Sequence, residues 1–255
     1  MKISGYEVAL LGLPADEPLA REPANPAGRR PTVLLRLQTD GGIEGIGFSF
    51  LGAGLSRALK VAIEDMAELC VGHDPLQPEL LRSRISAAAS GSGPAGIFTL
   101  ALAAIDIALW DISGKAAGQP LWHLLGADGS PVPTYASGAL MRELDLDACL
   151  RSSARLLEAG YTQVKMQLAL PGEYRPEKEV ERIARIREAL GDEVQLMCDI
   201  NQRWSVEQAL EMGPRLREFD LCWLEDPIAH DDFAGQARLL SDLSIPIATG
   251  EYVYG

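Results

Sequence analysis

Positive charge and long apolar runs are both scarce in this 255-residue sequence. Its 23 lysines and arginines stand against 36 aspartates and glutamates, a formal net charge of −13. Nucleic acids and anionic membranes are bound through clusters of positive side chains, so this balance argues against both as partners. The opening segment, MKISGYEVAL, lacks the apolar core of a signal peptide. The longest apolar stretch, FTLALAAIDIALW, is short and contains Asp106, so no membrane span is expected.

Cysteine and histidine are also rare. The four cysteines lie far apart, and three fall inside apolar helical or strand-like patterns. This spacing favours buried structural thiols and a reducing, cytoplasmic location over a disulfide framework. Of the three histidines, His73 and His123 lie in a turn and a connecting segment, where a structural or solvated side chain is expected. His230 follows an apolar strand, and a solvated role is favoured for it as well.

What the sequence does contain divides into two halves, predicted as domains 1–128 and 129–255. In the first half, two apolar runs flank Asp40-Gly41-Gly42, which predicts a hairpin because such turns need positive φ. Helical patterns follow over residues 56–71, 76–88 and 94–117, so this half is predicted to be α+β. Residues 14–31, rich in proline and alanine, are predicted to form a long loop.

The second half alternates strands with helices. Strands are predicted over residues 132–139, 161–168, 194–199, 221–226 and 245–251, with helices over 145–159, 176–190 and 232–243 and from Ser205. Gln208, three residues after Ser205, fits a capping box, whereas Gly213-Pro214 is expected to kink or restart that helix. Buried strands alternating with helices predict a parallel sheet with helices outside it.

Three carboxylates end successive strands of this half. Asp199, Glu225 and Glu251 follow one another at a spacing of 26 residues, about the length of one strand–helix unit. If the units wind into a barrel, the acids converge on one rim, where barrel enzymes carry their chemistry. A single acid after a strand is often simply solvated, but three together would repel one another without a cation between them. All three offer hard oxygen ligands, which suits Mg²⁺ and leaves Ca²⁺ and Mn²⁺ open.

Lys165 is a lone cation in an apolar strand one unit earlier. Strand side chains alternate, so Lys165 and Gln167 share a face that points away from the apolar one and toward the acids. A lysine beside a divalent cation has a lowered pKa, which makes its neutral amine accessible. The alternative is a lysine at a frayed strand end that pairs with any nearby acid. Asp199 and Asn201 share a face in the same way.

The run VKMQ, MCDINQRW, WLEDPI and ATGEY resembles the barrel of the enolase superfamily, in its mandelate racemase and muconate-lactonizing branch. Residues 103–126 resemble that branch's connection from cap to barrel. The resemblance covers essentially the whole chain. It implies an α/β fold, a (β/α) TIM-type barrel with an N-terminal α+β capping domain. Five predicted strands fall short of the eight of such a barrel, so its C-terminal strands are expected to be missing here.

The resemblance also implies a site. Asp199, Glu225 and Glu251 would hold Mg²⁺, which chelates the substrate carboxylate and stabilises the enediolate formed when a base removes the α-proton. Asn201 is similar to a substrate-contacting position of the family. Residues 14–31 and 48–54 resemble cap loops that close over the site and set specificity. Relatives often form dimers to octamers, so a homo-oligomer is expected.

One departure from the family bears on the reaction. The usual Lys-x-Lys motif reads Lys165-Met166-Gln167, and glutamine can hydrogen-bond a substrate but cannot act as a base. Lys165 is therefore expected to assist the enediolate electrostatically, and service as the base is its alternative role. The general base, a His–Asp pair, is expected after Gly255. Racemisation needs bases on both faces, so Gln167 favours dehydration. The leading hypothesis is a hydro-lyase that converts a sugar acid, a small-molecule carboxylate, to a 2-keto-3-deoxy acid. A racemase or epimerase of a 2-hydroxy acid and a catalytically silent ligand-binding relative are the alternatives.

Overall fold

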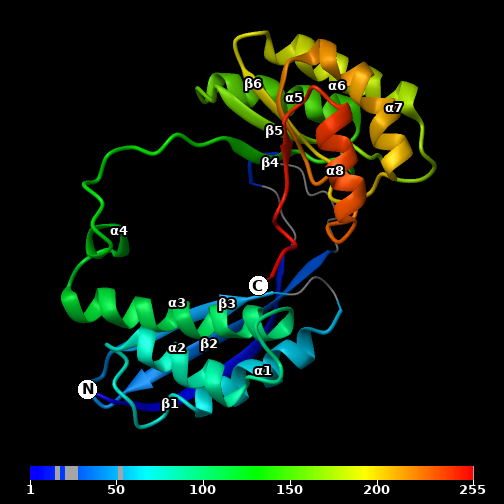
Figure 1. The fold of residues 1–255 in the computed structure, drawn as a ribbon. Helices are drawn as coiled ribbons and strands as arrows, with labels where there is room; N and C mark the ends of the chain where they lie inside the picture. The colour runs from blue at the N-terminus through cyan, green and yellow to red at the C-terminus, as the bar shows by residue number, and fades with distance from the viewer. Residues whose placement is uncertain (15–17, 21–27, 51–53, 255) are drawn as a thin grey trace. The chain divides into compact units, whose positions relative to one another are not determined.

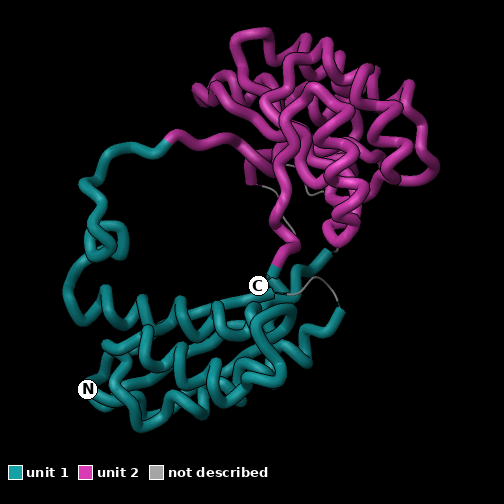
Figure 2. The backbone as a smooth tube through the Cα atoms, viewed as in Figure 1, with its two compact units in different colours: residues 1–14, 28–132, 254–255 teal, residues 15–27, 133–253 magenta. Residues whose placement is uncertain are grey.

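The computed structural model describes residues 1–14, 18–20, 28–50 and 54–254. The chain forms two compact units (Figure 2). Unit 1 comprises residues 1–14, 28–132 and 254–255, and unit 2 comprises residues 15–27 and 133–253. Each unit has its own apolar core, and each is described by itself below.

Unit 1 is an antiparallel sheet followed in the chain by helices (Figure 1). The sheet has the strand order β1-β2-β3, and the buried side chains of β2 pack with those of the helices. The elements are β1 (Ile3–Pro14), β2 (Arg29–Thr39), β3 (Glu44–Ser49), α1 (Ser56–Glu68), α2 (Pro78–Ala88), α3 (Ile97–Ala117) and α4 (Leu121–Leu124). The predicted α+β architecture of this half is thereby confirmed.

The hairpin predicted around Asp40-Gly41-Gly42 forms. β2 and β3 pair antiparallel, and Gly42 has a φ of 78°, in the left-handed region that glycine adopts without strain. The loop predicted over residues 14–31 was too long at both ends, because Pro14 pairs with Arg29 and Gly12 pairs with Pro31 across β1 and β2. Residues 15–17 and 21–27 of that loop, and 51–53 of the predicted cap segment 48–54, lie outside the described residues.

Glycine lets α3 approach the sheet of unit 1 closely. A Cβ on Gly45 would lie 2.2 Å from the carbonyl oxygen of Ala108, and a Cβ on Gly47 would lie 1.9 Å from that of Ala104. No side chain fits at such distances, so both positions of β3 require glycine. α3 is long and apolar enough to cross a membrane by length and composition. In this structure one side of it is buried in the core of unit 1, which explains its apolar sequence.

Unit 2 is a parallel sheet with helices between its strands (Figure 1). The strands lie in sequence order, β4-β5-β6-β7-β8, and every neighbouring pair is parallel. The strands are β4 (Ala136–Leu140), β5 (Gln163–Gln167), β6 (Gln195–Asp199), β7 (Leu221–Glu225) and β8 (Ile247–Ala248). The helices are α5 (Leu146–Glu158), α6 (Pro176–Leu190), α7 (Val206–Leu216), η1 (Arg217–Phe219) and α8 (Phe233–Asp242). The predicted alternation of strands and helices is confirmed.

Strand β5 of unit 2 buries one face in the core and directs polar side chains to the other. In β5, Val164 and Met166 are fully buried in the core, whereas Lys165 and Gln167 on the opposite face are only partly buried. The register aligns the strand ends, because Gln167 lies beside Asp199 and Asp199 lies beside Glu225. The carboxyl ends of three strands therefore meet on one edge of the sheet.

Two local expectations for unit 2 have different outcomes. Ser205 and Gln208 form the predicted capping box at the start of α7. The helix does not restart at Gly213-Pro214, because α7 runs through both residues and is followed by η1 after Leu216, and the kink predicted there stays a prediction. Pro214 lies in the last turn, where it removes a single amide donor. A Cβ on Gly213 would lie 2.3 Å from Leu243, so this glycine serves a close contact with the segment after α8.

All four cysteines are thiols, as predicted. Cys70, Cys149 and Cys198 are buried, and Cys222 is half-buried. Burial raises the pKa of Cys70 to about 11 and also raises the pKa of Cys198. The thiols of Cys70 and Cys198 therefore stay protonated, and these side chains act as small apolar groups.

Candidate metal centre

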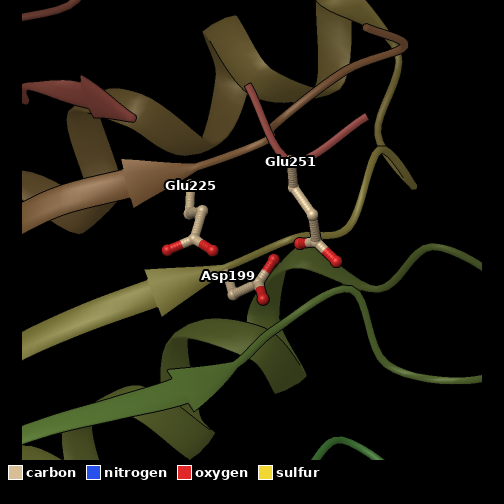
Figure 3. Close-up of side chains that lie close together, drawn as sticks. All are labelled: Asp199, Glu225 and Glu251. Atoms are coloured by element: carbon tan, nitrogen blue, oxygen red, sulfur yellow. The ribbon is translucent and has the colours of Figure 1, made fainter. Parts of the chain in front are cut away.

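The three predicted carboxylates lie together at the carboxyl edge of the parallel sheet. One oxygen atom from each of Asp199, Glu225 and Glu251 lies within 4.8 Å of the others. Figure 3 shows the side chains of Asp199 and Glu225 at the ends of neighbouring strands, with Glu251 reaching toward them from the segment after β8. The convergence predicted from their spacing is therefore present in the structure.

The position of Glu251 differs from the prediction. Asp199 and Glu225 are the last residues of β6 and β7 and pair with each other, but the partner of Glu225 in β8 is Ala248. β8 ends at Ala248, and Glu251 lies in the turn that follows. Gly250, with a φ of 128°, lets this turn carry the carboxylate of Glu251 back to the other two. The equal sequence spacing of the three acids thus predicted the cluster correctly, although Glu251 does not pair in register with Glu225.

Glu225 is held by a donor on each carboxylate oxygen. The ammonium of Lys165 lies 2.6 Å from Oε1, and the indole Nε1 of Trp223 donates to Oε2 at 2.9 Å. Lys165 also lies 3.5 Å from Oδ2 of Asp199 and 5.7 Å from the ring centroid of Tyr135. The prediction that Lys165 turns toward the acids is confirmed. Trp223, two residues before Glu225 on the same face, was missed, although strand alternation would have identified it.

Asp199 is held by the residue that follows it by two positions. The backbone amide of Asn201 donates to Oδ1 at 2.9 Å, and the side-chain amide donates to Oδ2 at 3.0 Å. Asn201 has a φ of 49°, a left-handed conformation that asparagine tolerates better than most residues. Asn201 therefore fixes the orientation of the buried Asp199 carboxylate.

Desolvation and mutual repulsion shift the pKa values of the acids. Burial and the neighbouring charge of Glu225 raise the pKa of Asp199, and burial together with Asp199 and Asp226 raises the pKa of Glu251. Burial lowers the pKa of Lys165, but its hydrogen bond to Glu225 and the charge of Asp199 outweigh burial, so this pKa is raised. In the absence of a bound cation, Lys165 is thus a firmly charged partner of the acids.

Sequence reasoning also missed Arg142, which follows β4 by two residues. Its side chain is 3% exposed, and its guanidinium lies against the turn that carries Asp199 and Asn201. Its backbone amide lies 3.5 Å from Oε1 of Gln167, at the limit of a hydrogen bond. A charged residue just past a strand on this edge is a recognisable signal, but the predicted strand ended too early to give it.

The three histidines make local contacts, and their structural or solvated roles stay predictions. The ring of His123 lies 3.2 Å from the side-chain oxygen of Gln119 in unit 1, and the backbone carbonyl of His73 accepts a hydrogen bond from Ile3. His230 lies after β7, where its backbone amide and its ring Nδ1 both contact Oε1 of Gln202. None of the three belongs to the carboxylate cluster among the described residues.

The donor set fits a hard divalent cation. It consists of three carboxylates from three separate segments, of which Asp199 is 3% exposed. Burial and repulsion disfavour this arrangement unless a positive charge compensates it, and oxygen donors of this kind are the ligands that Mg²⁺ prefers.

Comparisons with known proteins identify the family. Residues 19–126 match the mandelate racemase / muconate lactonizing enzyme N-terminal domain, and residues 148–255 match the enolase C-terminal domain-like family. Both halves of the fold and the order of their motifs agree with this match. The chain therefore belongs to the enolase superfamily, in the mandelate racemase and muconate lactonizing enzyme family.

The chain is also similar to individual proteins of this family. The chain is 31% identical to L-talarate/galactarate dehydratase of Salmonella typhimurium over 98% of its length, and 34% identical to arabinonate dehydratase of Saccharolobus solfataricus over 87%. It spans 63% and 59% of the lengths of these two relatives. The structure of a racemase from Streptomyces coelicolor A3(2) with bound magnesium is similar over 98% of this chain and 70% of that one, at 29% identity and a TM-score of 0.87.

Proposed function

We propose that this protein is a Mg²⁺-dependent hydro-lyase that dehydrates a sugar acid to a 2-keto-3-deoxy acid. The observation that carries the proposal is the cluster of Asp199, Glu225 and Glu251 beside a partly buried lysine. The dehydratases among the relatives support the reaction, and the magnesium-bound racemase structure supports the ion. In this proposal residues 1–128 form the capping domain and residues 129–255 form the part of the barrel that carries the metal site.

The ion would be held by the three carboxylates. When bound, Mg²⁺ supplies a Lewis acid that chelates the substrate carboxylate and stabilises the charge that develops when the α-proton leaves. Trp223 and Asn201 keep the carboxylates of Glu225 and Asp199 oriented, so the ligand geometry is set before an ion arrives.

Lys165 is assigned the role of an electrostatic catalyst. The side chain of Lys165 is 11% exposed, and its ammonium lies beside the carboxylates of Glu225 and Asp199. It is therefore a fixed positive charge in a site that is largely shielded from water. Such a charge stabilises negative charge that develops on the substrate. Gln167 has an amide that can donate to a substrate hydroxyl and an oxygen that can accept from one, and it cannot take a proton. Asn201 is assigned to substrate contact in the same way.

The substrate class follows from this chemistry. Dehydration needs a carboxylate with an acidic α-proton and a hydroxyl on the β-carbon, which a sugar acid supplies. The α-proton and the β-hydroxyl leave as water, and the enol that remains becomes the 2-keto-3-deoxy acid. A homo-oligomer located in the cytoplasm completes the proposal, and the general base is not assigned to any described residue.

The decisive experiment is a screen of sugar acids with Mg²⁺, read out as 2-keto acid formed. We expect one or a few substrates to give product with loss of water and activity to disappear with EDTA. Product with inverted configuration and no loss of water would identify a racemase or epimerase instead. Binding of Mg²⁺ and of a sugar acid without any turnover would identify a silent ligand-binding relative.

A further inference from the structure

The carboxyl edge of the parallel sheet holds a buried cation, Arg142, in addition to the partly buried Lys165. Arg142 lies in the loop after β4, and its side chain extends past the end of β5 to the turn after β6. It is 3% exposed, so its guanidinium is not a surface charge that water could solvate. A buried guanidinium needs hydrogen-bond acceptors, and the acceptors of Arg142 indicate its role in the structure.

Every hydrogen bond of the Arg142 side chain to a described residue goes to the segment Asp199–Asn201. Nη1 donates to the carbonyl of Ile200 at 3.2 Å, and Nη2 donates to the carbonyl of Asp199 at 3.2 Å. Nη2 also donates to the side-chain oxygen of Asn201. Three acceptors on three consecutive residues are thus held by one planar group.

This contact fixes the amide of Asn201. Because Oδ1 of Asn201 accepts from Arg142, Nδ2 of the same amide is turned toward Oδ2 of Asp199, to which it donates at 3.0 Å. The chain of contacts runs from the guanidinium through the amide to the carboxylate. It also holds Asn201 in its left-handed backbone conformation, from which the backbone amide reaches the other oxygen of Asp199.

We propose that Arg142 is a positioning residue of the metal centre, which orients the Asp199 carboxylate through Asn201. The proposal rests on the proposed function, because it assumes that Asp199 binds the ion. Arg142 does not itself meet the ion or the substrate, since it is buried and both of its Nη atoms donate to the turn, while Nε has no partner among the described residues. It acts through the residues that do.

Gln167 contacts Arg142 from the strand between Arg142 and Asp199. β5 lies between β4 and β6, and Gln167 is the residue of β5 beside Asp199. Its side-chain oxygen lies 3.5 Å from the backbone amide of Arg142, at the limit of a hydrogen bond. Because glutamine is neutral, it adds no charge to an edge that already holds the guanidinium and Lys165.

Positioning and electrostatics predict opposite signs for the loss of Arg142. A positive charge near the site repels a dication, so removing it for that reason alone would strengthen Mg²⁺ binding. Removing a residue that orients a ligand weakens binding, typically by about 10- to 100-fold. The sign of the change in Kd thus separates the two roles.

The test is calorimetric titration of the chain with Mg²⁺ alone, in the wild type and in Arg142→Met and Arg142→Lys. We expect the Kd to rise by about 10-fold or more in both variants, because lysine keeps the charge but lacks the planar fork that spans the turn. An unchanged or lower Kd in Arg142→Lys overturns the proposal. If Arg142→Met fails to fold, Arg142→Lys carries the test.

The link through Asn201 is tested by a double-mutant cycle. In an Asn201→Ala background, Arg142→Lys is expected to change the Mg²⁺ Kd by a clearly smaller factor than in the wild type. Full additivity overturns Asn201 as the link.

Arg187 provides a matched control at the other end of the same sheet. Its guanidinium also spans backbone carbonyls, of Val194 at 2.7 Å and of Phe219 at 2.9 Å, near the starts of β6 and β7. Arg187→Lys is expected to leave the Mg²⁺ Kd unchanged. An equal loss of affinity in this control would overturn the proposal, because it would show a general loss of structure. If the wild type itself binds no Mg²⁺, the proposed function fails and this inference fails with it, whereas wild-type binding with unaffected Arg142 variants refutes the inference alone.

Discussion

Each end of the parallel sheet is crossed by an arginine, half-buried at the amino end and buried at the carboxyl end, and the two differ in what surrounds them. At the amino end, Arg187 donates to backbone carbonyls of Val194 and Phe219. At the carboxyl end, Arg142 donates to backbone carbonyls as well, but also to the amide of Asn201, which in turn holds a buried carboxylate. An arginine links backbone segments at one end of the sheet, and an arginine contacts the residue that orients a carboxylate at the other end.

This difference shows that an arginine bonded to backbone carbonyls at a sheet end does not by itself mark a functional site. At the amino end, the hydrogen-bond acceptors of the guanidinium among the described residues are backbone carbonyls. At the carboxyl end, the acids repel one another and their pKa values are raised at Asp199 and Glu251, although Lys165 lies beside them. A cluster of acids that a neighbouring lysine compensates only in part is what distinguishes a candidate binding site from a structural contact.

The largest effect is expected from Asp199→Asn at the carboxyl end. Loss of one anionic ligand should weaken Mg²⁺ binding by more than about 100-fold, beyond the range for residues that only orient a ligand. Calorimetry with Mg²⁺ measures this, with circular dichroism to confirm the fold. Unchanged affinity would remove Asp199 from the site and abolish the functional difference between the two ends.

Lys165→Met should separate binding from turnover. Lys165 occupies Oε1 of Glu225, so its removal frees this oxygen and takes away a competing charge. The Mg²⁺ Kd is expected to fall or stay constant, while the rate of 2-keto acid formation falls by about 100-fold. Retained turnover would show that Lys165 is only a structural partner of the acids.

Arg187→Lys sharpens the comparison from the amino end. Loss of the guanidinium bonds to Phe219 and Val194 is expected to lower the free energy of unfolding by about 2 kcal/mol. Urea denaturation measures this change. Stability equal to that of the wild type would mean that the amino-end contact contributes nothing measurable.

The smallest effect is expected from Ser205→Ala. Ser205 caps α7 six residues after Asp199, and its hydroxyl accepts from the amide of Gln208 at 3.2 Å. Its loss should cost about 1 kcal/mol of stability. Because the cap does not touch the carboxylates, the Mg²⁺ Kd should stay constant, and a shift in Kd would show that the start of α7 is coupled to the site.

Much of this arrangement was predictable from the sequence, because strand alternation and strand-end acids depend on local periodicity. Lys165, Asp199 and Glu225 followed from these rules, and the structure brings them together. The turn that carries Glu251 was not predicted, because the length of β8 depends on pairing with β7 and not on its own residues. Arg142 was missed for a related reason. Its contacts join residues almost 60 positions apart, as the separation of 59 from Asn201 shows, and no periodic pattern reports such a pair.

The unequal burial of the four thiols gives this protein a site for selective chemical labelling. Cys70, Cys149 and Cys198 are sealed in the two cores, whereas Cys222 is half-buried and stands three residues before Glu225. A maleimide dye added to the native protein should attach at Cys222 first, with no need for mutagenesis. Its fluorescence would then report on the strand that ends at the carboxylates.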